Sequence, residues 1–192
     1  MKKASAVLFF VIFCFNIQAQ DLAWDINFEK VNGRELESLP VSQIIRLETG
    51  DIIQFSVMPA VNAWCYVLFY DSQRQISILH DQQLSASQNR IFGPFELTEP
   101  AGTETIYVII GLEKQTNLER LIREFNNNPG SRTSANNLYR EIIGMQSSVS
   151  KLGEPASSYI PSGGTTRGTA LKQNVTRFTG RDLYVRAITI RH

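Results

Sequence analysis

The sequence of 192 residues contains only two cysteines and two histidines. Cys14 lies in an apolar N-terminal run, so the rest of the chain has one thiol, Cys65. One thiol excludes an internal disulfide, and its place within an apolar run is typical of a small buried side chain. His80 and His192 have no spacing of the C-x-x-C, H-x-x-x-H or HExxH kind, so the sequence predicts no metal site and no cofactor. His80 follows a predicted strand beside Asp81, where we expect a solvated imidazole.

The chain also lacks an excess of charge of either sign. It has 19 Lys and Arg against 18 Asp and Glu, and no block of basic residues that could follow a phosphate backbone. This balance argues against a nucleic-acid partner. After the N-terminal run, no stretch approaches the roughly 20 apolar residues that a membrane helix needs. We therefore expect no transmembrane span in the mature chain.

The N-terminus has the pattern of a secretory signal peptide. Lys2 and Lys3 precede the apolar run 6–15, and a small residue, Ala19, follows it. We expect cleavage after Ala19, which would leave residues 20–192, with 17 basic and 18 acidic side chains, in the periplasm or outside the cell. The alternative is a lipid anchor on Cys14, which the bulky side chain before it disfavours.

The stretch 51–111 consists of apolar runs separated by turn residues. Apolar and polar residues alternate over 53–57, which indicates a strand with one face on a core. The runs 64–70 and 105–111 are apolar on both faces, as in central strands that are covered on both sides. Arg90–Leu97 contains Gly93-Pro94, and proline restricts such a run to an edge or a bulge. The pattern predicts a mainly β (α+β) fold, an antiparallel β-sandwich or partly open barrel with an inserted two-helix hairpin.

Strands are also predicted on both sides of this block. Residues 24–29 alternate and end at the turn pair Asn32-Gly33, and Leu183–Ile190 forms a final strand. The predicted core is 20–112 together with 182–191, and all of 20–192 is one domain.

The segment 114–152 has the period of helices. Thr116 and Glu119 match a capping box, and apolar residues follow at helical spacing until Pro129-Gly130. A second apolar stripe from near Ser134 predicts another helix, which gives a helical hairpin. Its stripes either cover one face of the sheet or leave a groove for a partner.

The segment 153–181 is rich in Gly, Pro, Ser and Thr and predicts a long loop. Tyr159 suggests that this loop packs, and Arg167 lies in a stretch that faintly resembles an anion-binding loop. Elsewhere, Trp64, Tyr66 and Tyr70 share one strand face. They could stack on sugars, although aromatic residues in a domain of this size form the core more often.

No catalytic spacing is present, and in particular no G-x-S-x-G nucleophile elbow. A pair of carboxylates for glycoside hydrolysis could still come together in the fold from four candidates. These are Glu96, Glu99, Glu104 and Glu113.

The order of turns and strands in 47–111 resembles an uncharacterised bacterial family, domain of unknown function (DUF) 4384. The residues that carry the resemblance are Thr49-Gly50-Asp51, Cys65–Asp71, Ile76–Leu79, Gly93-Pro94-Phe95 and Pro100–Thr105. They span about a third of the chain. The resemblance implies a β-rich module of exported bacterial proteins and carries over no catalytic residue. The chain departs from the family at Arg74-Gln75, where the hairpin usually has a glycine.

These observations lead to one main hypothesis and two alternatives. The main hypothesis is an exported, non-catalytic module that binds a protein or glycan of the bacterial cell envelope. Its expected contact surfaces are the helical hairpin and the loop 153–181, with Tyr159, Arg167, Trp64, Tyr66 and Tyr70 as candidate binding residues. One alternative is a hydrolase of an envelope polymer whose carboxylates converge only in the fold, and the other is a purely structural domain.

Overall fold

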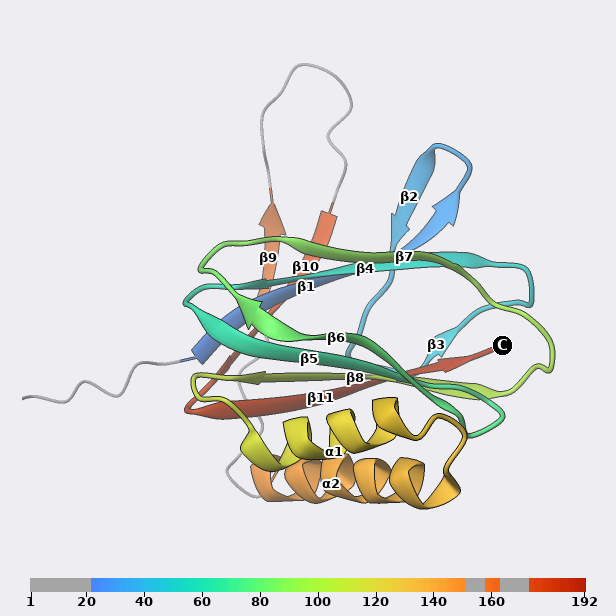
Figure 1. Ribbon diagram of the computed structural model, residues 1–192. Coiled ribbons are helices and arrows are strands. Elements are labelled where there is room, and N and C mark those ends of the chain that lie inside the picture. The colour runs from blue at the N-terminus through green and yellow to red at the C-terminus, as the bar shows by residue number, and fades with distance from the viewer. Residues whose placement is uncertain (1–21, 151–157, 163–172) are drawn as a thin grey trace, which may run out of the picture.

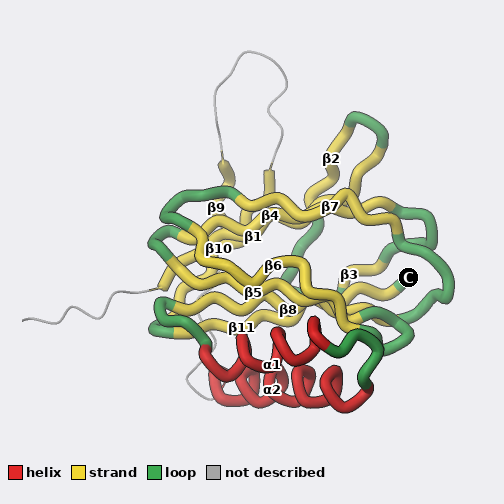
Figure 2. Tube along the Cα trace, in the orientation of Figure 1, coloured by secondary structure: helices red, strands yellow, loops and turns green. Residues whose placement is uncertain are grey.

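The computed structural model describes residues 22–150, 158–162 and 173–192. In this part of the chain, two β-sheets pack face to face and two helices cover the outer side of one of them (Figures 1 and 2). The fold is thus a β-rich α+β sandwich and not a closed barrel, in agreement with the first of the two predicted architectures. The predicted signal peptide and Arg167 lie outside the described residues.

Sheet A, the upper layer in Figure 1, has the strand order β7-β4-β1-β10-β9, and β2 pairs with β1. β1 pairs with β2 and β9 pairs with β10, which are consecutive strands, whereas β10 lies beside β1 from the other end of the chain. The strands are β1 (Leu22–Asn32), β2 (Glu35–Ser38), β4 (Ile52–Pro59), β7 (Arg90–Glu96), β9 (Ser158–Ser162) and β10 (Gln173–Gly180). As its Gly-Pro pair predicts, β7 lies at an edge.

Sheet B has the strand order β3-β11-β8-β5-β6 and lies between sheet A and the helices. Its strands are β3 (Ile45–Arg46), β5 (Ala63–Tyr70), β6 (Ile76–Leu84), β8 (Thr103–Gly111) and β11 (Leu183–Arg191). β3 runs parallel to β11, and the other pairs are antiparallel. The central strands β5 and β8 are those that the sequence predicts to be covered on both faces.

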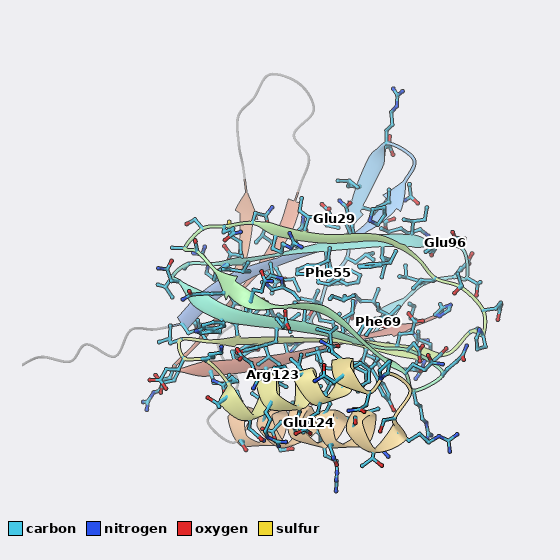
Figure 3. The ribbon with its side chains drawn as sticks, viewed as in Figure 1. Glu29, Phe55, Phe69, Glu96, Arg123 and Glu124 are labelled. Carbon is cyan, nitrogen blue, oxygen red and sulfur yellow. The ribbon has the colours of Figure 1, made fainter. Side chains whose placement is uncertain are left out.

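The main core lies between the two sheets. The inward faces of β1 and β4 bring Trp24, Phe28 and Phe55 into it, and the rings of Phe28 and Phe55 stack with centroids 5.7 Å apart. Alternate residues of these strands are polar and point outward, where Glu29 accepts hydrogen bonds from Asn27 and Gln54 (Figure 3). The alternation in the sequence thus gives the correct faces for both strands.

A second core lies between sheet B and the helices α1 (Thr116–Asn127) and α2 (Arg132–Ser150). The apolar stripes of both helices are buried there, against the sheet B side chains that face away from sheet A. The buried stripe residues are Leu118, Leu121, Ile122, Leu138 and Ile142, and the partly buried ones are Phe125, Met145 and Val149. The stripes therefore cover the sheet, which was the first of the two predicted roles.

Both helices begin differently from the sequence prediction. Gln115 is the N-cap of α1 and makes no side-chain cap hydrogen bond, so the predicted capping box does not form. The reason is that the Glu119 carboxylate is bound elsewhere, to the Tyr66 hydroxyl at 3.1 Å and to Lys114 at 2.8 Å. α2 begins two residues earlier than predicted, because the Ser131 hydroxyl oxygen accepts from the backbone amide of Ser134 at 3.3 Å.

The prediction of one long loop over 153–181 is wrong for its described residues. Both β9 and β10 lie within this range, and β10 pairs with β1 along Ile26–Leu22. Phe178 of β10 stacks on Trp24 with ring centroids 4.8 Å apart, which explains why this segment is ordered as a strand. Residues 151–157 and 163–172 lie outside the described part, as do the side chains of β9.

The turn between β5 and β6 keeps a glycine-like geometry without a glycine. Arg74 has a φ of 65°, in the left-handed region that glycine occupies at low cost. The backbone amide of Arg74 donates to the Asp71 carbonyl oxygen at 3.0 Å and closes the turn. The hairpin predicted at 71–75 is therefore present, and an arginine stands at its left-handed position.

The structure gives one finding on membrane insertion. Over residues 22–150, 158–162 and 173–192, no helix combines the length and the apolar character needed to cross a bilayer.

Candidate functional site

A pocket of about 400 Å³ opens at one end of the sandwich. We call it the end pocket. Its walls come from both sheets, and Figure 3 labels Glu96 of β7 and Phe69 of β5, which represent the two sides. The lining residues are Ile53, Phe69, Asp71, Ser72, Gln73, Leu79, Pro94, Phe95, Glu96, Leu97, Thr98, Glu99, Pro100, Glu104 and Ile106.

Backbone hydrogen bonds fix the segment that leads from β7 to β8 along the pocket. The Leu97 amide donates to the Asp51 carbonyl at 2.9 Å, and the Leu97 carbonyl accepts from the Gly50 amide at 2.7 Å. Further along, the Ser72 hydroxyl donates to the Pro100 carbonyl at 2.9 Å. The turn after β5 and the segment before β8 are thereby held together, so the pocket has a fixed wall on each side.

Glu104 is the most unusual residue of the end pocket. It lies at the start of β8, where Ile106, Val108 and Ile110 alternate toward the core between the sheets. The period of two places Glu104 on the same inward face, and its side chain is only 8% exposed. One of its carboxylate oxygens, Oε2, is buried and has no hydrogen-bond partner within the described residues. A buried oxygen of this kind is costly unless a ligand or water satisfies it.

The other carboxylate oxygen of Glu104 faces a histidine. Oε1 lies 3.4 Å from Nε2 of His192, whose side chain is fully buried and whose Nδ1 lies 3.4 Å from the Thr49 hydroxyl. Burial raises the pKa of Glu104 above its usual value, and the neighbouring His192 opposes this rise. The geometry therefore holds one buried carboxyl group in the wall of the pocket.

Comparison of the chain with family models, with curated proteins and with solved structures finds no match. The site must therefore be understood from its own geometry.

The other three carboxylates of the end pocket lie nearer its rim. Asp71 Oδ1 accepts from the Gln75 amide at 2.7 Å, and Glu99 Oε2 accepts from the Ala101 amide at 2.8 Å, so both close turns. Glu96 is exposed on β7. Among the described lining residues, four are acidic and none is basic. The pocket thus combines apolar walls with negative charge.

The three aromatic residues that share one face of β5, for which the sequence favours a place in the core over stacking on sugars, pack in the cluster between the sheet and the helices. Tyr66 is fully buried and Trp64 is partly buried beneath the ammonium of Lys114, which lies 4.8 Å from the ring centroid. Tyr70 stacks on Tyr139 of α2 at 4.8 Å. A role for Tyr66 in binding sugars is excluded by this burial, and the three rings serve to join the sheet to the helices. The Tyr159 side chain lies outside the described part.

The two chemically reactive side chains that the sequence singles out have different surroundings. Cys65 is fully buried, and burial raises the pKa of its thiol to about 12, which agrees with the predicted inert core residue. The prediction of a solvated His80 is wrong, because β6 continues to Leu84 and His80 lies within the strand. Its Nε2 is buried without a described partner, and burial lowers the pKa of the ring.

Across the described residues, no group of three or more His, Cys, Asp or Glu side chains could hold a metal ion.

Sequence reasoning named Glu96, Glu99 and Glu104 only as acids near turns. The structure places all three in one pocket, and the fourth candidate, Glu113, is not among its lining residues. A signal for Glu104 is present in the sequence: it continues the inward alternation of Ile106, Val108 and Ile110 by one further position. The alternation predicts an apolar core residue at position 104, so an acid there is the signal that distinguishes Glu104 from the other acidic residues.

Proposed function

We propose that this chain is an exported, non-catalytic binding module of the bacterial cell envelope, and that its binding site is the end pocket. The observation that carries the proposal is a pocket of about 400 Å³ between two tightly packed sheets. This volume lies within the range of sites for small ligands or for one or two side chains of a partner. The predicted signal peptide and the resemblance to a family of exported modules support the location.

A protein partner agrees better with the pocket than a glycan. The walls include the apolar side chains of Phe69, Leu79 and Ile106, which suit an apolar stem. Sugars are bound through many hydrogen bonds and through flat, open aromatic faces. The rings proposed for that purpose, of which Tyr66 is an example, lie under the helices. We therefore assign the pocket to a side chain that a partner protein inserts.

A photo-crosslinking experiment tests this assignment. A photoreactive amino acid is placed at Gln73, an exposed residue that lines the pocket, in the full chain expressed in its native host. The control position is Gln83, which is exposed on β6 and does not line the pocket. We expect an adduct with an envelope protein from Gln73 only, and its loss when Leu79→Trp fills the pocket of a chain that melts as the wild type does. Equal adducts from both positions, or an adduct that survives the filled pocket, would contradict the proposal.

A second candidate is the hydrolase, and Glu104 is the observation that favours it. An acid with a raised pKa in an apolar pocket beside other carboxylates is the pattern of a general acid. In this role Glu104 would protonate the leaving oxygen of the glycosidic bond, and Glu96 or Asp71 would take a proton from the water that attacks the sugar carbon. Release of dye from labelled peptidoglycan by the wild type, and its loss in Glu104→Gln, would establish this activity. A purely structural domain needs no pocket and is the least supported alternative.

A further inference from the structure

We infer that the end pocket binds an organic cation on an apolar stem, the side chain of a lysine or arginine of the partner protein, with Glu104 as its anionic contact. The inference rests on the proposed function and names the chemical class of the group that enters the pocket. It depends on the position of Glu104, on the charge of the lining and on the apolar walls.

One carboxylate oxygen of Glu104, Oε2, is a hydrogen-bond acceptor with no donor bound to it among the described residues. The side chain is more than nine-tenths buried, Oε2 has no described partner, and the residue lines the pocket. On its other side, Oε1 faces Nε2 of His192. Oε2 has almost no accessible surface, so the Glu104 side chain must turn toward the pocket for a cation to reach it. This contact displaces no hydrogen bond of Oε2, and it removes the cost of leaving that oxygen unsatisfied.

The charge of the pocket selects a positive ligand. Its described lining contains four carboxylates and no basic side chain. Asp71 and Glu99 are bound to backbone amides of their own turns. They therefore contribute negative potential at the rim, which attracts a cation, and Glu104 contributes the direct contact inside.

The walls select an organic cation over a metal ion. Ca²⁺ takes six to eight oxygen ligands and Mg²⁺ takes six, and the described residues form no such cluster. Phe69, Leu79 and Ile106 instead provide apolar contact for a chain of methylene groups. Lysine and arginine bury such a stem while their charged group finds a polar partner.

A matched pair of small probes tests the inference. Nα-acetyl-lysine-methylamide and Nα-acetyl-norleucine-methylamide have side chains with four carbon atoms each, and only the lysine compound carries an ammonium group. Each is titrated into ¹⁵N-labelled chain 20–192, and dissociation constants are obtained from amide chemical shifts. We expect the lysine probe to bind at least tenfold more tightly and to shift the amides of Phe69 and Leu97.

Substitutions identify the carboxylate responsible. Glu104→Gln keeps the size of the side chain and removes its charge, so the tenfold preference should vanish while the norleucine probe binds as before. Glu104→Asp keeps the charge and should keep part of the preference. Glu113→Gln is the matched control, because Glu113 is exposed and does not line the pocket. It should leave both constants unchanged.

The inference is overturned if the two probes bind wild type equally, if neither binds, or if Glu104→Gln retains the tenfold preference. These failures are separable from failure of the proposed function. If the Gln73 adduct forms and the pocket shows no preference for the cation, the binding module stands and the ligand class is wrong. If the adduct is also absent, both proposals fall.

Discussion

The Tyr66 hydroxyl joins the start of helix α1 to the sheet beneath it, and Tyr66→Phe should lower the free energy of unfolding by about 2 to 3 kcal/mol. The hydroxyl accepts a hydrogen bond from the Gln115 amide and donates one to the Glu119 carboxylate, each at 3.1 Å. The first is a neutral bond worth about 1 kcal/mol, and the second involves a charged group and is worth about 1.5 kcal/mol or more. In the variant, the Gln115 amide and the Glu119 carboxylate lose the Tyr66 hydroxyl at the start of α1, where burial limits the access of water that could replace it.

Urea unfolding of the chain 20–192, followed by circular dichroism, measures this change. With a urea m-value of about 2 to 3 kcal/mol per molar, the midpoint should fall by about 1 M. Tyr70→Phe is the matched control, since its ring stacks on Tyr139 and the stack remains in the variant. Its midpoint should move by less than a quarter as much. If the two variants shift equally, the hydrogen bonds of Tyr66 do not hold the helix, and the account of the helix–sheet junction is wrong.

Three further predictions concern stability and reactivity. Burial raises the folded-state pKa of Glu104 above its unfolded value, so the free energy of unfolding should fall as pH rises between these two pKa values. Thermal melts from pH 4 to 8 measure this fall, and Glu104→Gln should remove it. Arg74→Gly should raise the free energy of unfolding by roughly 0.5 to 1 kcal/mol, because glycine adopts the left-handed backbone conformation of this position at no steric cost. A lower urea midpoint for the variant would show that the arginine is not strained. Cys65 should react with a thiol reagent at pH 8 only after unfolding, and rapid reaction of the native chain would contradict its burial.

Much of the fold could be predicted because the apolar period of this chain is local and clear. The alternation around Phe55 gives a strand with one face on the core, the run containing Tyr66 gives a central strand, and Gly93-Pro94 gives an edge strand. The helical stripes are equally clear. The segment containing β10 was missed because its order depends on pairing with β1, about 150 residues away, and on the stacking of Phe178 on Trp24. Distant pairing leaves little trace in local composition.

The site was less predictable than the fold, for a related reason. The end pocket takes its walls from five strands and the segments between them, so no single motif encodes it. The aromatic residues of β5 looked like a binding surface because the sequence does not show which face the helices will cover. Glu104 alone carried a local sign, an acid on the inward face of a strand, because that pattern needs only the period of two.

The late position of β10 and β11 in the chain has a consequence for the order of events during synthesis. Until the residues after 172 have been made, sheet A lacks β10, which joins β9 to β1, and sheet B lacks β11, which lies between β3 and β8. A nascent chain that stops earlier has two unfinished sheets with open edges, which cannot close on a common core. Dependence on these two strands delays the closure of both sheets until β10 and β11 have been made. That delay suits a protein that is threaded across a membrane before it folds, as the export proposed for this chain requires.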